Sequence, residues 1–237
     1  MTALVLLAAT SMGAAGAPPA RVAPTASTVR PARTQELAAL LDGHHAWSKP
    51  SVRSAPLEVV HARRPITGEQ TVLPVLGHRT SADGLRWLHV RLPGRPNGHT
   101  GWIKRRATVS SRTSWRLVVN PSRRRVLVYH RGRLVRVFRA VVGKPSTPTP
   151  RGRFFVEESI RLRPSGVGAP FALALSARSN VLRRFDGGPG QIGLHGLANV
   201  GGVPGTAVSH GCVRLDNSVM RWLVARIGPG APVTITG

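Results

Sequence analysis

Short apolar runs separated by glycine- and proline-containing turns fill most of the chain and constrain its fold. In the second half the runs are SWRLVVN, RVLVYH, RLVRVFRAVVG, RFFVEES, FALALS and IGLHG. Runs of this length, rich in valine, phenylalanine and leucine and joined by Pro-Ser and Arg-Gly turns, predict strands. We therefore expect a mainly β protein in which residues 114–237 form one β-rich domain.

One segment of this domain has helical rather than strand spacing. Either Asp216 or Asn217 can cap a helix, and Gly228 with Pro229 can end it before a last strand, PVTIT. The helix would place these apolar residues on one face: Met220, Leu223, Val224 and Ile227. We expect a single short helix there.

Residues 52–109 form a second group of short runs, LEVV, TVLPVL and RWLHVRL. An Asn97-Gly98 turn follows, which is the strongest short hairpin signal. These features predict a small β-barrel, in which Trp87 and Trp102 are expected to pack in the core rather than stack on a ligand. The run WLHVRLPGRPNGHTGWI resembles bacterial SH3-like domains, so we interpret residues 52–109 as an SH3-like domain.

The first fifty residues differ in composition from the rest. Residues 1–17 are an apolar run followed by small residues, which is typical of a secretory signal peptide. Residues 18–51 are expected to be a linker with a short helix that begins after Thr34 and ends at Gly43. The protein is therefore expected to be exported to the cell wall or a periplasm-equivalent space.

The charge balance is strongly basic. The chain has 34 Lys and Arg residues against 9 Asp and Glu, a formal net charge of +25. Such a surface attracts polyanions, among them nucleic acid, anionic lipid and anionic cell-wall polymer. Export and the lack of a recognition helix argue against a nucleic-acid partner, whereas an anionic cell-wall polymer remains a candidate.

Cys212 is the only cysteine of the chain and lies in the segment SHGCVRLDN. An unpaired cysteine is usually a small buried hydrophobe, but polar neighbours and the adjacent Gly211 favour a reactive thiol. A thiol nucleophile needs a base and donors for an oxyanion. His195, at the end of a predicted strand, can be the base, with the Gly196 carbonyl orienting its imidazole. The N–H groups of His210, Gly211 and Cys212 can line an oxyanion pocket, and the start of the following helix favours thiolate.

Two other chemistries are less well supported. A metal site would use Cys212, His210 and His195, but no C-x-x-C or H-x-x-x-H spacing accompanies them, so no metal is expected. Hydrolysis by paired carboxylates would need more acidic residues than the second half contains.

The segment HGLANVGGVPGTAVSHGCVRL, residues 195–215, resembles the signature of the L,D-transpeptidase catalytic domain of the YkuD type. VGKPSTPTPRGRF and IGLHG match further stretches of that family in the same order, so the resemblance covers about 120 residues. It implies a β-sandwich catalytic domain over residues 114–237.

The resemblance also implies roles for individual residues. Cys212 would be the acylated nucleophile and His195 the general base, with the shaping and oxyanion elements supplied by Ser209, His210 and Gly211. Substrate contacts would come from Arg214, Phe171 and Gly196. Arg214 could instead brace the loop, and Phe171 could instead belong to the core.

The implied activity is acyl transfer between peptidoglycan stem peptides through a Cys212 thioester, without metal or organic cofactor. The product would be a cross-link between the third residues of two stems, and carbapenem-type β-lactams would acylate the same cysteine. Two alternatives stay open at this point. Water could replace the acceptor amine, which would make the enzyme an L,D-carboxypeptidase, or the chain could be a non-catalytic cell-wall-binding protein.

Overall fold

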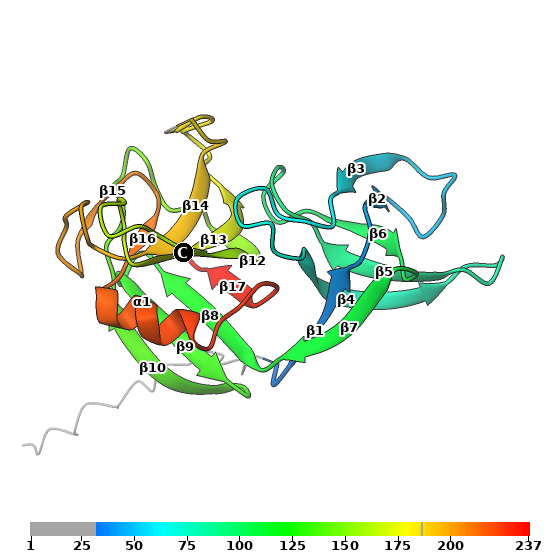
Figure 1. Ribbon diagram of the computed structural model, residues 1–237, viewed down its shortest axis with the longest axis horizontal. Helices are drawn as coiled ribbons and strands as arrows, with labels where there is room; N and C mark the ends of the chain where they lie inside the picture. Colours follow the sequence, from blue (N-terminus) through cyan, green and yellow to red (C-terminus); the bar gives the residue numbers. More distant parts are fainter. Residues whose placement is uncertain (1–31, 186) are drawn as a thin grey trace, which may run out of the picture.

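The computed structural model describes residues 32–185 and 187–237, which form two large β-sheets side by side and one two-stranded ladder (Figure 1). Its described part contains seventeen strands and one helix, so the mainly β fold class is confirmed. No helix in this part is both long and apolar enough to cross a bilayer. The predicted signal peptide, residues 1–17, and the linker up to residue 31 lie outside the described residues.

The first sheet has seven strands in the order β3-β2-β6-β5-β4-β1-β7. The expected Asn97-Gly98 hairpin joins β5 to β6, and Trp87 is buried in the core as predicted. Trp102 is only half-buried and stacks on His89, with ring centroids 4.8 Å apart. The strands are β1 (Gln35–Leu40), β2 (His44–Trp47), β3 (Pro56–Val60), β4 (Val72–Thr80), β5 (Arg86–Arg91), β6 (Thr100–Lys104) and β7 (Thr108–Thr113).

The helix expected after Thr34 is wrong, because residues 35–40 are the strand β1. This strand pairs with β4 on one side and with β7 on the other. Two ladders satisfy its backbone N–H and C=O groups, whereas an isolated helix of this length is not stable in water. Within the expected linker, residues 18–51, the strands β1 and β2 therefore belong to the first sheet.

The second sheet has eight strands in the order β10-β9-β8-β17-β12-β13-β14-β16. The last strand, β17, lies in the middle of the sheet, parallel to β8 and antiparallel to β12. A separate two-stranded ladder is formed by β11 (Val142–Gly143) and β15 (Ala207–Ser209). The eight strands are β8 (Trp115–Asn120), β9 (Arg125–His130), β10 (Arg133–Arg139), β12 (Gly152–Arg161), β13 (Phe171–Arg178), β14 (Gln191–His195), β16 (Val213–Arg214) and β17 (Pro232–Ile235).

The predicted helix after Cys212 is confirmed as α1 (Asn217–Val224), with Asp216 at its N-cap position. Met220 and Leu223 are its buried residues, and Ile227 packs into the same core just beyond its end. Covering this apolar face holds the helix against the second sheet, because eight residues alone would not form a stable helix. The segment between β16 and β17 is therefore fixed next to the Cys212 loop.

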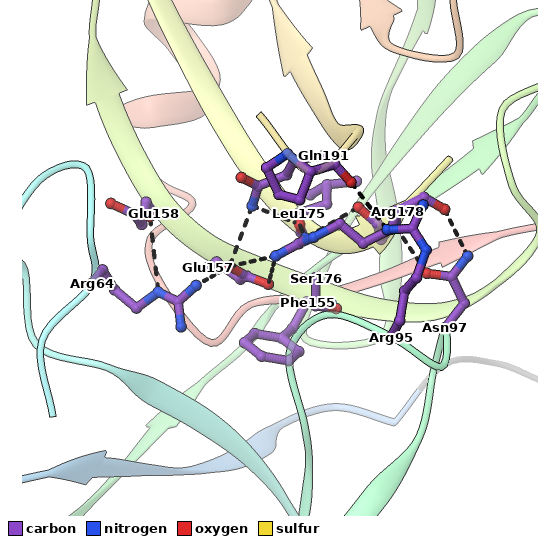
Figure 2. Close-up of polar contacts among 12 residues, drawn as sticks. Arg64, Arg95, Asn97, Phe155, Glu157, Glu158, Leu175, Ser176, Arg178 and Gln191 are labelled. Carbon is purple, nitrogen blue, oxygen red and sulfur yellow. Dashed lines mark hydrogen bonds and ion pairs between the residues drawn. The ribbon is translucent and has the colours of Figure 1, made fainter. Parts of the chain in front are cut away.

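The two sheets meet along β12. Phe155 of this strand is buried in the core of the first sheet, whereas its neighbour Phe154 belongs to the core of the second. Figure 2 shows the polar part of the contact, where Glu157 of β12 pairs with Arg64, from the segment between β3 and β4, and with Arg178 of β13. The contact between the two sheets therefore has an apolar part, at Phe155, and a charged part, at Glu157.

Candidate active site

The Cys212 loop lies between β15 and β16 at one edge of the second sheet. Because β16 pairs in parallel with β14, Cys212 is brought alongside the strand that carries His195. The Cys212 Sγ lies 3.9 Å from the Gln191 carbonyl oxygen, to which the thiol donates. Residues 191, 193 and 195 alternate with buried core residues, so they share one face of β14.

His195 is held in one tautomer. Its Nδ1 lies 2.8 Å from the Gly196 carbonyl oxygen, the contact expected from the sequence. A carbonyl can only accept, so Nδ1 carries the proton and Nε2 keeps a free lone pair. Burial lowers the pKa of His195, with a smaller opposing effect from the Gly196 hydrogen bond. The neutral imidazole can therefore act as a base at neutral pH.

The Cys212 thiol does not ionise readily by itself. Burial raises its pKa, and the Gly193 N–H and the charge of Arg214 offset only part of that effect. The sequence analysis expected the following helix to favour thiolate, whereas burial raises the pKa of the Cys212 thiol. The resting pair is thus a thiol and a neutral imidazole, and nucleophilic attack at Cys212 requires proton transfer to a base.

Ser209 braces the loop from inside. Its hydroxyl donates to the Cys212 carbonyl oxygen at 2.6 Å and accepts the Gly211 N–H at 3.1 Å. The Gly211 N–H is therefore not available for an oxyanion pocket, which corrects the expectation of three successive donors. Gly211 has φ +119°, and a β-carbon there would lie 3.0 Å from Ile192 Cδ1, so the turn requires glycine.

Two N–H groups of the loop remain available. Within the described residues, the backbone N–H groups of His210 and Cys212 donate to no protein acceptor. The His210 side chain is exposed, with its ring centroid 5.4 Å from that of Phe185. No group of three potential metal-ligating side chains occurs among the residues that the structure describes. The loop thus offers a thiol and two backbone donors, and the neighbouring strand β14 carries the imidazole of His195.

This geometry coincides with a match to a known family. The model of the YkuD family, the L,D-transpeptidase catalytic domain, matches residues 114–235. The chain belongs to this family. The match spans the second sheet from β8 to β17, and it confirms the resemblance inferred from the sequence.

Two YkuD proteins illustrate the similarity. The one from Bacillus licheniformis is 32% identical over 122 residues, covering 52% of this chain and 66% of the relative. The one from Bacillus subtilis is 31% identical over 103 residues, covering 44% of this chain and 54% of the relative. The chain therefore matches less than two thirds of the length of either relative.

Solved structures give more distant similarities. An L,D-transpeptidase from Mycobacterium smegmatis has 19% identity and a TM-score of 0.39, covering 65% of this chain and 91% of that one. L,D-transpeptidase 3 from Mycobacterium tuberculosis, in complex with a faropenem-derived adduct, has 15% identity and a TM-score of 0.45. In that comparison 70% of this chain and 91% of the other are covered.

Two threonines of the YkuD domain were not singled out from the sequence. Thr147 donates to the Ser209 carbonyl oxygen at 3.2 Å, and Thr149 donates to the Gly211 carbonyl oxygen at 2.9 Å. Both side chains are buried, so these hydrogen bonds hold the Cys212 loop without competition from water. The stretch VGKPSTPTPRGRF, already matched to the family, contains both and could have indicated them.

His195 has a second support that the sequence analysis missed. Gly168, with φ +81°, packs against the imidazole so closely that a β-carbon would overlap the ring. The Asn217 side chain accepts the Leu197 N–H at 2.9 Å, which ties the turn after β14 to the start of α1. Only the tertiary structure brings these segments to His195.

The remaining predicted site residues are Arg214, which follows the loop in β16, and Phe171, which begins β13. Arg214 donates to the carbonyl oxygens of Val200 and Gly201 at 3.3 and 3.2 Å, which is a bracing geometry. Phe171 is half-buried, packs against the core of the domain and lines a cleft of about 370 Å³ with Arg221. Phe171 therefore combines core contacts with an exposed edge in a cleft.

Proposed function

We propose that this chain is a peptidoglycan L,D-transpeptidase that works through a thioester on Cys212. The observation that carries the proposal is that Cys212, directly before β16, is held alongside β14, the strand that carries His195, in a YkuD domain. Nε2 of His195 is left unprotonated. A half-buried thiol near a neutral imidazole is suited to general-base-assisted attack on a carbonyl.

In the first half-reaction, Cys212 Sγ attacks the carbonyl carbon between the diamino acid and the terminal D-alanine of a tetrapeptide stem. The thiol proton moves to His195 Nε2 as the S–C bond forms. The N–H groups of His210 and Cys212 are the candidate donors to the oxyanion. The C–N bond then breaks, the proton passes from Nε2 to the departing amine of D-alanine, and a thioester remains.

In the second half-reaction, a side-chain amine from another stem attacks the thioester carbonyl. His195 Nε2 takes a proton from that amine, the C–S bond breaks, and the sulfur of Cys212 recovers its proton. The new amide joins the third residues of two stems. If water replaced the amine, the same steps would release a tripeptide stem, and the enzyme would be an L,D-carboxypeptidase.

Location and partners follow from this substrate. Stem peptides lie outside the cytoplasm, so the proposal includes export, with residues 1–17 as the signal peptide and residues 52–109 as an SH3-like domain. Carbapenem-type β-lactams would acylate Cys212, since they present a strained carbonyl to the same nucleophile. No step of the proposed chemistry draws on a metal or organic cofactor.

Mass spectrometry of reaction products tests the proposal. The purified protein and its Cys212→Ala variant would be incubated with a disaccharide-tetrapeptide from peptidoglycan. We expect dimers that have lost one D-alanine, formed only when Cys212 is present. Tripeptide monomers without dimers would make the protein a carboxypeptidase, and unchanged substrate would leave a binding role for the basic surface.

A further inference from the structure

The two sheets meet at two arginine-lined places along β12. In the middle of the strand, Arg64 and Arg178 pair with the buried carboxylate of Glu157 (Figure 2). Near its start, a cleft of about 440 Å³ is lined by Arg91 of β5, Arg116 of β8 and Arg153 of β12. Among the described residues that line this cleft there are three arginines but no acidic residue.

The three arginines of the cleft converge although they come from both sheets. Arg91 donates through Nη1 to the Gly98 carbonyl oxygen at 2.7 Å. A β-carbon on Gly98 would lie 3.8 Å from that Nη1 and 3.3 Å from the Arg153 carbonyl oxygen. The β5–β6 hairpin is therefore in contact with the start of β12, where Arg91 and Arg153 line the same cleft.

These arginines lack counter-ions. Among the described residues, none of the three forms an ion pair, and Nε of Arg116 is buried without any hydrogen-bond partner. Burial lowers the pKa of Arg91 and of Arg116, and the positive charge of Arg153 lowers both further. A buried donor without a partner and mutually repelling cations are both costly in a folded protein.

The segment outside the described residues does not supply the missing charge. The first acidic residue of the sequence is Glu36, so residues 1–31 contain no carboxylate side chain. Within the described residues, none of those that line the cleft is acidic, so the cleft itself supplies no counter-ion.

We infer that Arg91, Arg116 and Arg153 form a binding site for a phosphate group carried by a small organic unit. Guanidinium groups bind phosphate oxygens through paired N–H donors, and a phosphate offers more oxygens and more charge than a carboxylate. The cleft is larger than a phosphate ion, and apolar side chains line it beside the arginines, among them Pro74, Leu76 and Phe154. A phosphate ester or one phosphodiester repeat of a polymer fits this combination.

The site is separate from the proposed acyl transfer. No residue that lines the cleft belongs to the Cys212 loop or to β14. Phosphate binding can therefore be measured without substrate turnover, and its presence or absence does not bear on the chemistry at Cys212. A ligand held by side chains from both sheets would also stabilise their contact, because it binds the folded state only.

Isothermal titration of the whole protein with glycerol phosphate and with a short glycerol-phosphate oligomer tests the inference. We expect one saturable site per chain for glycerol phosphate. Arg116→Gln and Arg153→Gln should each weaken it about tenfold or more, since each removes charged hydrogen bonds. Arg116→Lys, which keeps the charge but not the paired donors, should lose nearly as much. The matched control is Arg133→Gln, which removes one exposed arginine at the start of β10.

The outcomes separate a built site from general surface charge. Tighter binding of the oligomer than of the single unit, with the same sensitivity to Arg116 and Arg153, would identify a polymer as the source. Equal binding of both would identify a free phosphate ester. Equal weakening by Arg133→Gln, or binding that never saturates, would overturn the site. Arg153 is exposed, so its variant keeps the test valid if the Arg116 variants fail to fold.

Discussion

The middle and the start of β12 each gather several arginines, but the two clusters differ in their acidic partners. Both bring arginines from the two sheets together, but only the middle contains carboxylates, Glu157 and Glu158, whose side chains are 0% and 1% exposed. The chain has only nine acidic residues, and two of them are buried at this one contact. The comparison teaches that an arginine cluster with internal carboxylates joins the sheets, whereas a cluster without them is available to an external anion.

The largest effect is expected for Glu157→Ala. Burial raises the pKa of Glu157 and lowers that of Arg178, so each depends on the charge of the other. Removing the carboxylate leaves Arg178 without its acidic partner and Arg64 with only the longer contact to Glu158, and should lower the free energy of unfolding by about 3–5 kcal/mol. Urea denaturation measures it, with the exposed Asp83→Asn as control. A loss no larger than that of the control would remove the distinction between the two places.

The two places should also differ in their influence on Cys212. Gln191 donates to Glu157 at 3.2 Å, and its own carbonyl oxygen lies 3.9 Å from Cys212 Sγ, whereas the cleft has no such link. Because burial raises the pKa of Cys212 above its ordinary value of 9.0, alkylation by iodoacetamide should rise about tenfold per pH unit from pH 7 to pH 9 without levelling off.

The same pH profile, measured on two variants, tests whether only the middle of β12 influences Cys212. Arg116→Gln should superimpose on the unmodified protein, and Gln191→Ala should shift the curve. A plateau near pH 7 would mean that the thiolate is already formed in the resting state. Acylation needs neutral His195. Because burial lowers the pKa of His195 below its ordinary value of 6.5, protonation of His195 should reduce the acylation rate only at pH values below 6.5.

A smaller effect is expected for Arg64→Ala, because Glu157 keeps its contacts with Arg178 and Gln191. The loss of one charged hydrogen-bonded partner should cost about 2 kcal/mol of unfolding free energy. Arg63→Ala is the matched control, since Arg63 lies next to it in the chain but is exposed. Arg64→Lys should recover part of the loss, and equal values for Arg63→Ala and Arg64→Ala would contradict the pairing.

The smallest effect is expected at the start of β12. Arg153→Gln removes an exposed cation that has no acidic partner among the described residues, so unfolding free energy should stay within about 0.5 kcal/mol or rise slightly. The measurement is thermal unfolding without phosphate. A loss as large as that of Arg64→Ala would show that this arginine, too, is part of the contact between the sheets.

Much of the fold and of the candidate site was predictable because the signals are local. The alternation of short apolar runs with turns predicted a mainly β chain, and the apolar spacing after Cys212 predicted α1. The SHGC segment and the IGLHG strand indicated the family and singled out Cys212 and His195 as candidate site residues, since those residues lie within short contiguous stretches. The Gly196 carbonyl next to His195 followed for the same reason.

The sequence by itself therefore determined the β class, the short helix after Cys212 and the family. The tertiary structure alone decided that residues 35–40 form β1, because strand partners more than thirty residues away satisfy its backbone. It also decided that the Ser209 hydroxyl accepts the Gly211 N–H, and that Glu157 of the second sheet forms an ion pair with Arg64. Only the folded chain separates arginines with a buried carboxylate from those without one, because charge pairing depends on distances in space and not on spacing along the sequence.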